Sequence, residues 1–149
     1  MKIVRRKYIR TVVERLLTSH AGLATPPIQV EDLAVALGID VRSTQPSDGA
    51  LSGFLVRDDG TGKTIIGINE DHPPTRKRFS IAHEIGHFLL HEGQEIYVDE
   101  CVKSGMRISL RNEESSKGTE IEEIEANVFA AELLMPVDCL RSDLAAYPD

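Results

Sequence analysis

Two histidines and a glutamate stand close together in the segment His83-Glu84-Ile85-Gly86-His87, an H-E-x-x-H pattern. In a helix, residues four apart differ by only about 40° around the axis, so His83 and His87 share one face. Two imidazole rings on one face can bind the same metal ion. Glu84 lies about 100° from His83, beside the open coordination position, where it can take a proton from water at the metal. The pattern therefore predicts metal-dependent hydrolysis of a peptide bond with Glu84 as the general base.

A zinc site of this kind needs a third protein ligand. His91 continues the row of histidines, but on a straight helix it lies about 12 Å from His83 along the axis, too far for all three rings to reach one ion. We therefore keep His91 as a candidate for hydrogen bonding to a ligand or for stabilising an oxyanion. Tyr97, Arg111 and His72 are further oxyanion candidates, and His91 ranks first because it is nearest the face that carries the site.

A second helical pattern, over residues 120–135, supplies the better third ligand. Glu123 lies on a narrow stripe with Asn127 and small residues that let another helix approach closely, so its carboxylate can face the two histidines. Asn127, one turn further on, is placed to hydrogen-bond a ligand. Glu122 and Glu125 are the alternative third ligands.

The other acidic residues of this helix have simpler interpretations. Thr119 and Glu122 fit a capping box, with Thr119 as the N-cap residue. Glu125 and Glu132 share a face for which we expect solvent exposure. The sequence thus predicts a metal centre formed by His83, His87 and Glu123.

The hydrophobic pattern indicates which elements position this centre. Helices are predicted over residues 5–19, 30–37, 75–91 and 120–135 and after Pro136, and strands over 39–42, 51–57, 63–69 and near 107–110. Gly38 is expected to end the second helix, and the Gly-rich segment 58–62 is typical of a hairpin turn. The order of elements favours an α+β fold with a sheet of about three strands. The strand over 64–69 is either an ordinary sheet edge or one to which an extended substrate adds.

Length and composition place the chain among globular proteins with one domain, here taken as 1–149. It has 149 residues, of which 41% are hydrophobic and 28% charged. No apolar run is long enough for a membrane span, and the basic start has no apolar segment after it, so we expect neither membrane insertion nor secretion. Only Cys101 and Cys139 carry thiols, and two cysteines form no disulfide framework, so we expect a cytoplasmic protein.

The charge distribution argues against direct nucleic-acid binding. The net charge is −7, whereas domains that bind nucleic acid through their overall charge are usually basic. Residues 1–10 carry five basic and no acidic side chains, so the rest of the chain has a net charge of −12. This basic start is expected to be the solvated face of a first helix, and a docking arm is the alternative. The oligomeric state stays open.

Two signatures together resemble the ImmA/IrrE family of bacterial and phage metallopeptidases. They are RFSIAHEIGHFLLH over residues 78–91 and EIEANVFAAELLMP over residues 123–136. The upstream strands around residues 52–54 and 65–69 look like the same family, and the resemblance covers about residues 28–137. Residues 1–27 then form an N-terminal helix and loop, and residues 138–149 a C-terminal helix or tail.

The resemblance implies a gluzincin-like zinc site in which the carboxylate and amide of the second signature correspond to Glu123 and Asn127. Some members of the family are reported to depend on manganese, so Mn²⁺ is the alternative to Zn²⁺. The characteristic substrate is a helix-turn-helix repressor, whose cleavage switches on phage, mobile-element or stress genes. The chain resembles the short members, because only thirteen residues follow Pro136, and we expect its activating signal to come from elsewhere. The alternative is a binding regulator, a metal-stabilised module of antirepressor or toxin–antitoxin type without proteolytic activity.

Overall fold

A computed structural model describes residues 3–45, 52–58, 60–91, 96–98 and 113–147 of the chain, with side chains at 96–98 and 113–119 left aside. The elements are α1 (Arg6–Ser19), a 3₁₀ turn (Ala21–Leu23), α2 (Val30–Ala36), β1 (Ile39–Thr44), β2 (Gly53–Asp58), β3 (Lys63–Asn69), α3 (Pro74–Leu90), β4 (Ile96–Val98), α4 (Glu113–Leu134) and α5 (Val137–Ala145). The predicted α+β class is confirmed.

The sheet has the strand order β1-β3-β2-β4. β1 is parallel to β3, and β2 is antiparallel to both β3 and β4. The three strands expected from the sequence are present, and the short β4 adds a fourth. The interpretation of β3 as a sheet edge is wrong, because β3 pairs with β1 on one side and with β2 on the other. The strand expected near residues 107–110 lies outside the described residues.

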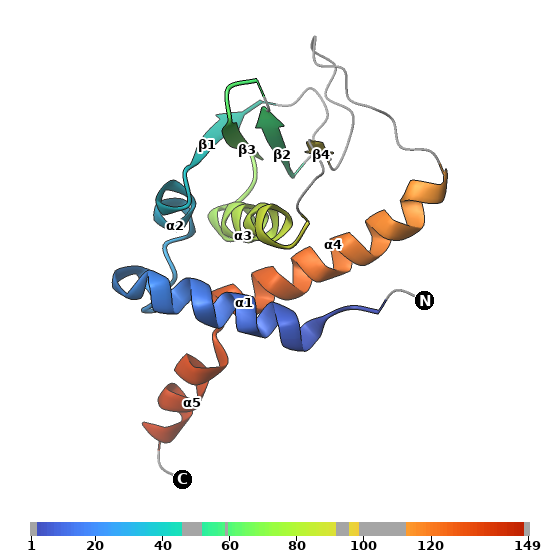
Figure 1. The fold of residues 1–149 in the computed structure, drawn as a ribbon. Coiled ribbons are helices and arrows are strands. Elements are labelled where there is room, and N and C mark those ends of the chain that lie inside the picture. Colours follow the sequence, from blue (N-terminus) through green and yellow to red (C-terminus); the bar gives the residue numbers. More distant parts are fainter. Residues whose placement is uncertain (1–2, 46–51, 59, 92–95, 99–112, 148–149) are drawn as a thin grey trace.

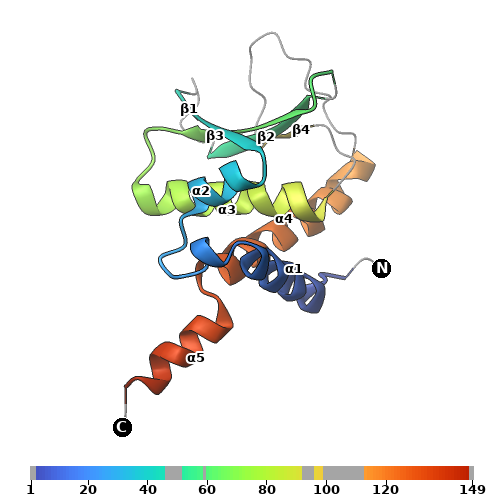
Figure 2. The same cartoon turned by 60° about the vertical axis from the view of Figure 1, so that its left-hand side comes forward.

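The elements form layers with the sheet on one side and helices on the other (Figures 1 and 2). α3 lies between the sheet and α4, and α1 packs across α4 on the side away from the sheet. Fully buried side chains join these layers, among them Leu55 and Ile66 from the sheet, Ile81 and Ile85 from α3, and Phe129 from α4. His83 and His87 lie on the face of α3 opposite Ile81 and Ile85, and this face packs against α4.

Local signals placed most helix ends correctly, but not the start of α4. Gly38 follows α2 with a φ of 80°, the left-handed conformation that a helix-ending glycine adopts. α4, however, begins at Glu113, seven residues before the predicted start. Thr119 therefore lies inside the helix, and its assignment as an N-cap residue in a capping box with Glu122 is wrong. No helix in the described part of the chain is both long and apolar enough to span a bilayer.

Gly86 lets α3 and α4 approach closely beside the two histidines. A Cβ atom added at this position would lie 3.0–3.2 Å from Phe129, including 3.1 Å from its Cβ, which a side-chain rotation cannot move away. We expect Gly86→Ala to lower the free energy of unfolding by about 1–2 kcal/mol, because overpacking outweighs the gain in helix propensity. Urea denaturation measures this loss.

Gly22 provides the matched control for this prediction. Nothing lies within 4 Å of a Cβ built at Gly22, so Gly22→Ala should change the free energy of unfolding by no more than about 0.5 kcal/mol. Equal effects of the two substitutions would contradict the proposed role of Gly86 in the contact between the helices.

Candidate metal centre

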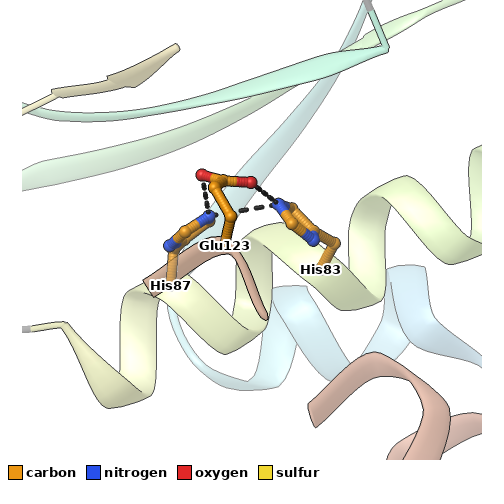
Figure 3. Close-up of side chains that lie close together, drawn as sticks. All are labelled: His83, His87 and Glu123. Atoms are coloured by element: carbon orange, nitrogen blue, oxygen red, sulfur yellow. Dashed lines mark hydrogen bonds and ion pairs between the residues drawn. The ribbon is translucent and has the colours of Figure 1, made fainter. Parts of the chain in front are cut away.

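The structure brings His83, His87 and Glu123 together at the contact between α3 and α4 (Figure 3). Nε2 of His83 lies 3.1 Å from Oε2 of Glu123, and Nε2 of His87 lies 3.0 Å from Oε1. The two Nε2 atoms are 3.1 Å apart. The histidine side chains are buried, whereas 37% of the Glu123 side chain is exposed. The centre is therefore closed on the α3 side and reached by solvent beside Glu123.

Asn127 fixes the ring of His83. Its Oδ1 lies 2.9 Å from Nδ1 of His83. An amide oxygen can only accept a hydrogen bond, so the Nδ1–H of His83 donates it. In the neutral ring the other nitrogen, Nε2, then carries a lone pair that points toward Glu123. α4 thus supplies both a carboxylate for the centre and, one turn later, the group that orients a histidine.

His91 has the corresponding position behind His87. Its Nδ1 lies 3.0 Å from Nδ1 of His87, and its Nε2 lies 3.0 Å from Oε2 of Glu125. Burial lowers the pKa of His91, despite the opposing hydrogen bond to Glu125, and favours a neutral ring. The neutral ring donates from Nε2 to Glu125 and accepts at Nδ1, so His87 donates from Nδ1 and turns its Nε2 lone pair toward Glu123.

His91 has two candidate roles, hydrogen bonding to a metal ligand and stabilising an oxyanion, and its contacts help to choose between them. Both of its ring nitrogens are engaged within the protein, which favours hydrogen bonding to His87 over the stabilisation of an oxyanion. Of the other oxyanion candidates, His72 lies 3.2 Å from the Asn69 amide through Nε2. The side chain of Tyr97 and all of Arg111 lie outside the described residues.

Glu125 is buried, which contradicts the expected exposure of this face of α4. Its side chain is only 3% exposed and forms an ion pair with Arg5 at 2.8 Å. The side-chain hydrogen bonds from Arg5 are the main reason that the pKa of Glu125 falls to about 2. Glu132 forms an ion pair with Arg10 at 3.3 Å. Two of the five basic residues at the start of the chain, Arg5 and Arg10, therefore have acidic partners on α4.

The chemistry of the donors fits a metal ion held by His83, His87 and Glu123. Two imidazole lone pairs and a carboxylate converge within hydrogen-bonding distance, so a cation, either protons on the rings or a metal ion, must compensate them. Burial would raise the pKa of Glu123, but when both rings carry protons on Nε2, their hydrogen bonds and charges outweigh burial and lower it. Two histidines and one glutamate are a known ligand set of catalytic zinc.

Glu84 lies in the same turn of α3 as His83 and is 1% exposed. Its carboxylate lies against Gly53 of β2, where an added Cβ would be 3.5 Å from Oε1. The alternative third ligands are placed differently. Glu125 is turned toward Arg5 and His91, and Glu122 is not among the three donors brought together.

An H-E-x-x-H helix packed against a small sheet, with a glutamate added from a second helix, is typical of one class of metallopeptidases. The chain belongs to the family described as the IrrE N-terminal-like domain, whose model matches residues 34–148. This is a peptidase family, and the match confirms the resemblance to ImmA/IrrE proteins. A search of the curated proteins finds no match.

Proposed function

We propose that this chain is a zinc-dependent, site-specific endopeptidase whose substrate is a helix-turn-helix transcriptional repressor. The convergence of three donor atoms from His83, His87 and Glu123, with Glu84 in the same turn of α3, carries the proposal. Membership of a peptidase family supports the hydrolysis. The net charge of −7 also suits a basic DNA-binding substrate, because opposite charges speed the encounter.

The side chains divide the work of hydrolysis. The chemistry that zinc supplies when bound is the polarisation of a carbonyl group and a lower pKa for water. His83, His87 and Glu123 hold the ion, while Asn127 and His91 keep the two rings in the required tautomers. The Glu84 carboxylate takes a proton from the attacking water and delivers it to the amine that leaves. In the cytoplasm, cleavage of the repressor would release phage, mobile-element or stress genes.

The experiment uses the purified chain and the helix-turn-helix repressor encoded beside its gene. We expect intact-mass analysis to show one cleaved bond in the repressor after incubation with Zn²⁺, and none when a chelator is added. Mn²⁺ in place of Zn²⁺ tests the alternative metal. A repressor that is bound but stays intact under all these conditions would overturn the peptidase proposal and favour a binding regulator.

A further inference from the structure

We propose that Arg5 and Glu125 are positioning residues for the metal centre, which act on His87 through His91. The inference rests on the proposed metal-dependent function. Its basis is a continuous series of hydrogen bonds from the beginning of α1 to a histidine of the H-E-x-x-H helix. The successive distances are 2.8 Å from Arg5 to Glu125, 3.0 Å from Glu125 to His91 and 3.0 Å from His91 to His87.

Arg5 restrains the Glu125 carboxylate almost completely. The backbone N–H of Arg5 and its side-chain Nε–H both donate to Oε1, each at 3.0 Å. Nη2 donates to Oε2, which also accepts the hydrogen bond from His91. Among the described residues, four hydrogen bonds reach this buried carboxylate, and three of them come from Arg5. Bidentate contact of this kind fixes direction as well as distance.

The orientation of the carboxylate determines how His87 is held. Glu125 accepts from Nε2 of His91, which leaves Nδ1 of His91 as the acceptor for the Nδ1–H of His87. That last bond turns Nε2 of His87 toward the centre. When the Arg5 side chain is removed, Glu125 loses two of these three hydrogen bonds and keeps only the one from the backbone N–H. Glu125 can then turn away from His91, so the ring of His87 is held less firmly. Partners that hold a ligand in this way typically contribute 10–100-fold to metal affinity.

This support comes from a part of the chain that the family model does not match. The model begins at residue 34, whereas Arg5 directly precedes α1. α1 packs across α4, the helix that carries Glu123 (Figures 1 and 2). Nη2 of Arg5 also reaches the carbonyl of Leu90 at the end of α3, at 3.4 Å. The N-terminal segment thus contacts both helices that carry the ligands.

Arg10 and Glu132 offer a matched control. They form a second ion pair between α1 and α4, at 3.3 Å. Within the described part of the chain, neither residue forms a hydrogen bond to a histidine. Removal of the Arg10 side chain breaks a more exposed ion pair between the same two helices without touching the series that leads to His87.

The test compares Arg5→Met, Arg5→Lys and Arg10→Met with the unaltered full chain. Zn²⁺ dissociation constants are measured by competition with a chromophoric chelator, and the visible spectrum of the Co²⁺-loaded protein reports ligand geometry. We expect Arg5→Met to weaken Zn²⁺ binding by about tenfold and to change the Co²⁺ bands. Both variants keep the backbone N–H, but Arg5→Lys also keeps the positive charge and should restore part of the affinity. Arg10→Met should match the unaltered chain.

Several outcomes would overturn the inference. Unchanged Zn²⁺ affinity and Co²⁺ spectrum in Arg5→Met would do so while leaving the proposed function intact. An equal loss in Arg10→Met would show that the docking of α1, and not the hydrogen bonds to Glu125, supports the centre. If Arg5→Met does not fold, Arg5→Lys takes its place. Unchanged Zn²⁺ affinity in Arg5→Lys, or an equal loss of affinity in Arg10→Met, would then overturn the inference. Failure of the unaltered chain to bind Zn²⁺ would overturn the proposed function and this inference together.

Discussion

Glu84→Gln is expected to slow peptide-bond hydrolysis severely while leaving metal binding intact. Glutamine has nearly the same shape as glutamate and fits the buried position of Glu84, which is 1% exposed. It cannot, however, accept a proton from the attacking water. General base catalysis typically contributes 10²–10⁴-fold, so we expect kcat/KM on the repressor to fall by about 10³-fold. The Zn²⁺ dissociation constant should change little, because His83, His87 and Glu123 are untouched.

Glu14→Gln is the control for the same chemical change at an exposed site on α1, and it should retain full activity. Cleavage by Glu84→Gln at the unaltered rate would show that another group is the base. The binding-regulator alternative predicts a different result. Under that alternative, Glu84→Gln relieves repression in cells as effectively as the unaltered chain but does not cleave the repressor.

Glu123→Ala is expected to weaken metal binding far more than Arg5→Met or Glu122→Ala does. It removes both carboxylate oxygens that lie 3.0–3.1 Å from the two histidines. Loss of a direct ligand should exceed the 10–100-fold effect of losing a partner that only orients one, so we expect Zn²⁺ binding to weaken by more than about 100-fold. Competition with a chelator and the zinc content of the dialysed protein measure this effect.

Glu122→Ala makes the same change one position earlier on α4. Because Glu122 is not among the three converging donors, this variant should bind Zn²⁺ within a few-fold of the unaltered chain. If Glu122→Ala loses as much affinity as Glu123→Ala, the assignment of the third ligand to Glu123 is wrong.

The sequence was most informative where the signal is local. β3 has the predicted bounds, α3 differs from its predicted bounds by one residue at each end, and Gly38 ends α2 as expected. The spacing of His83 and His87 also placed both rings on one face. These features depend on helical periodicity and turn chemistry, which are set by residues close together in the chain.

Apart from the start of α4 and its capping box, the errors concern contacts between distant segments. The interior position of β3 depends on its pairing with β1, which no local pattern specifies. The burial of Glu125 depends on Arg5, 120 positions away. A signal for this burial was nevertheless present. Glu125 lies four residues, about one helical turn, before Phe129, which is fully buried, so a glutamate in this row required a partner.

The separation of the centre between two helices has a consequence for the lifetime of the protein. His87 and Glu123 stand 36 positions apart in the chain. An ion shared between them would act as a removable cross-link, and in the chain-entropy model closure of a loop of this length stabilises a fold by about 3–4 kcal/mol. Because the unfolded chain does not hold these donors together, ion binding adds to the free energy of unfolding. Metal supply would then govern how long the protein resists degradation, as well as whether it can act.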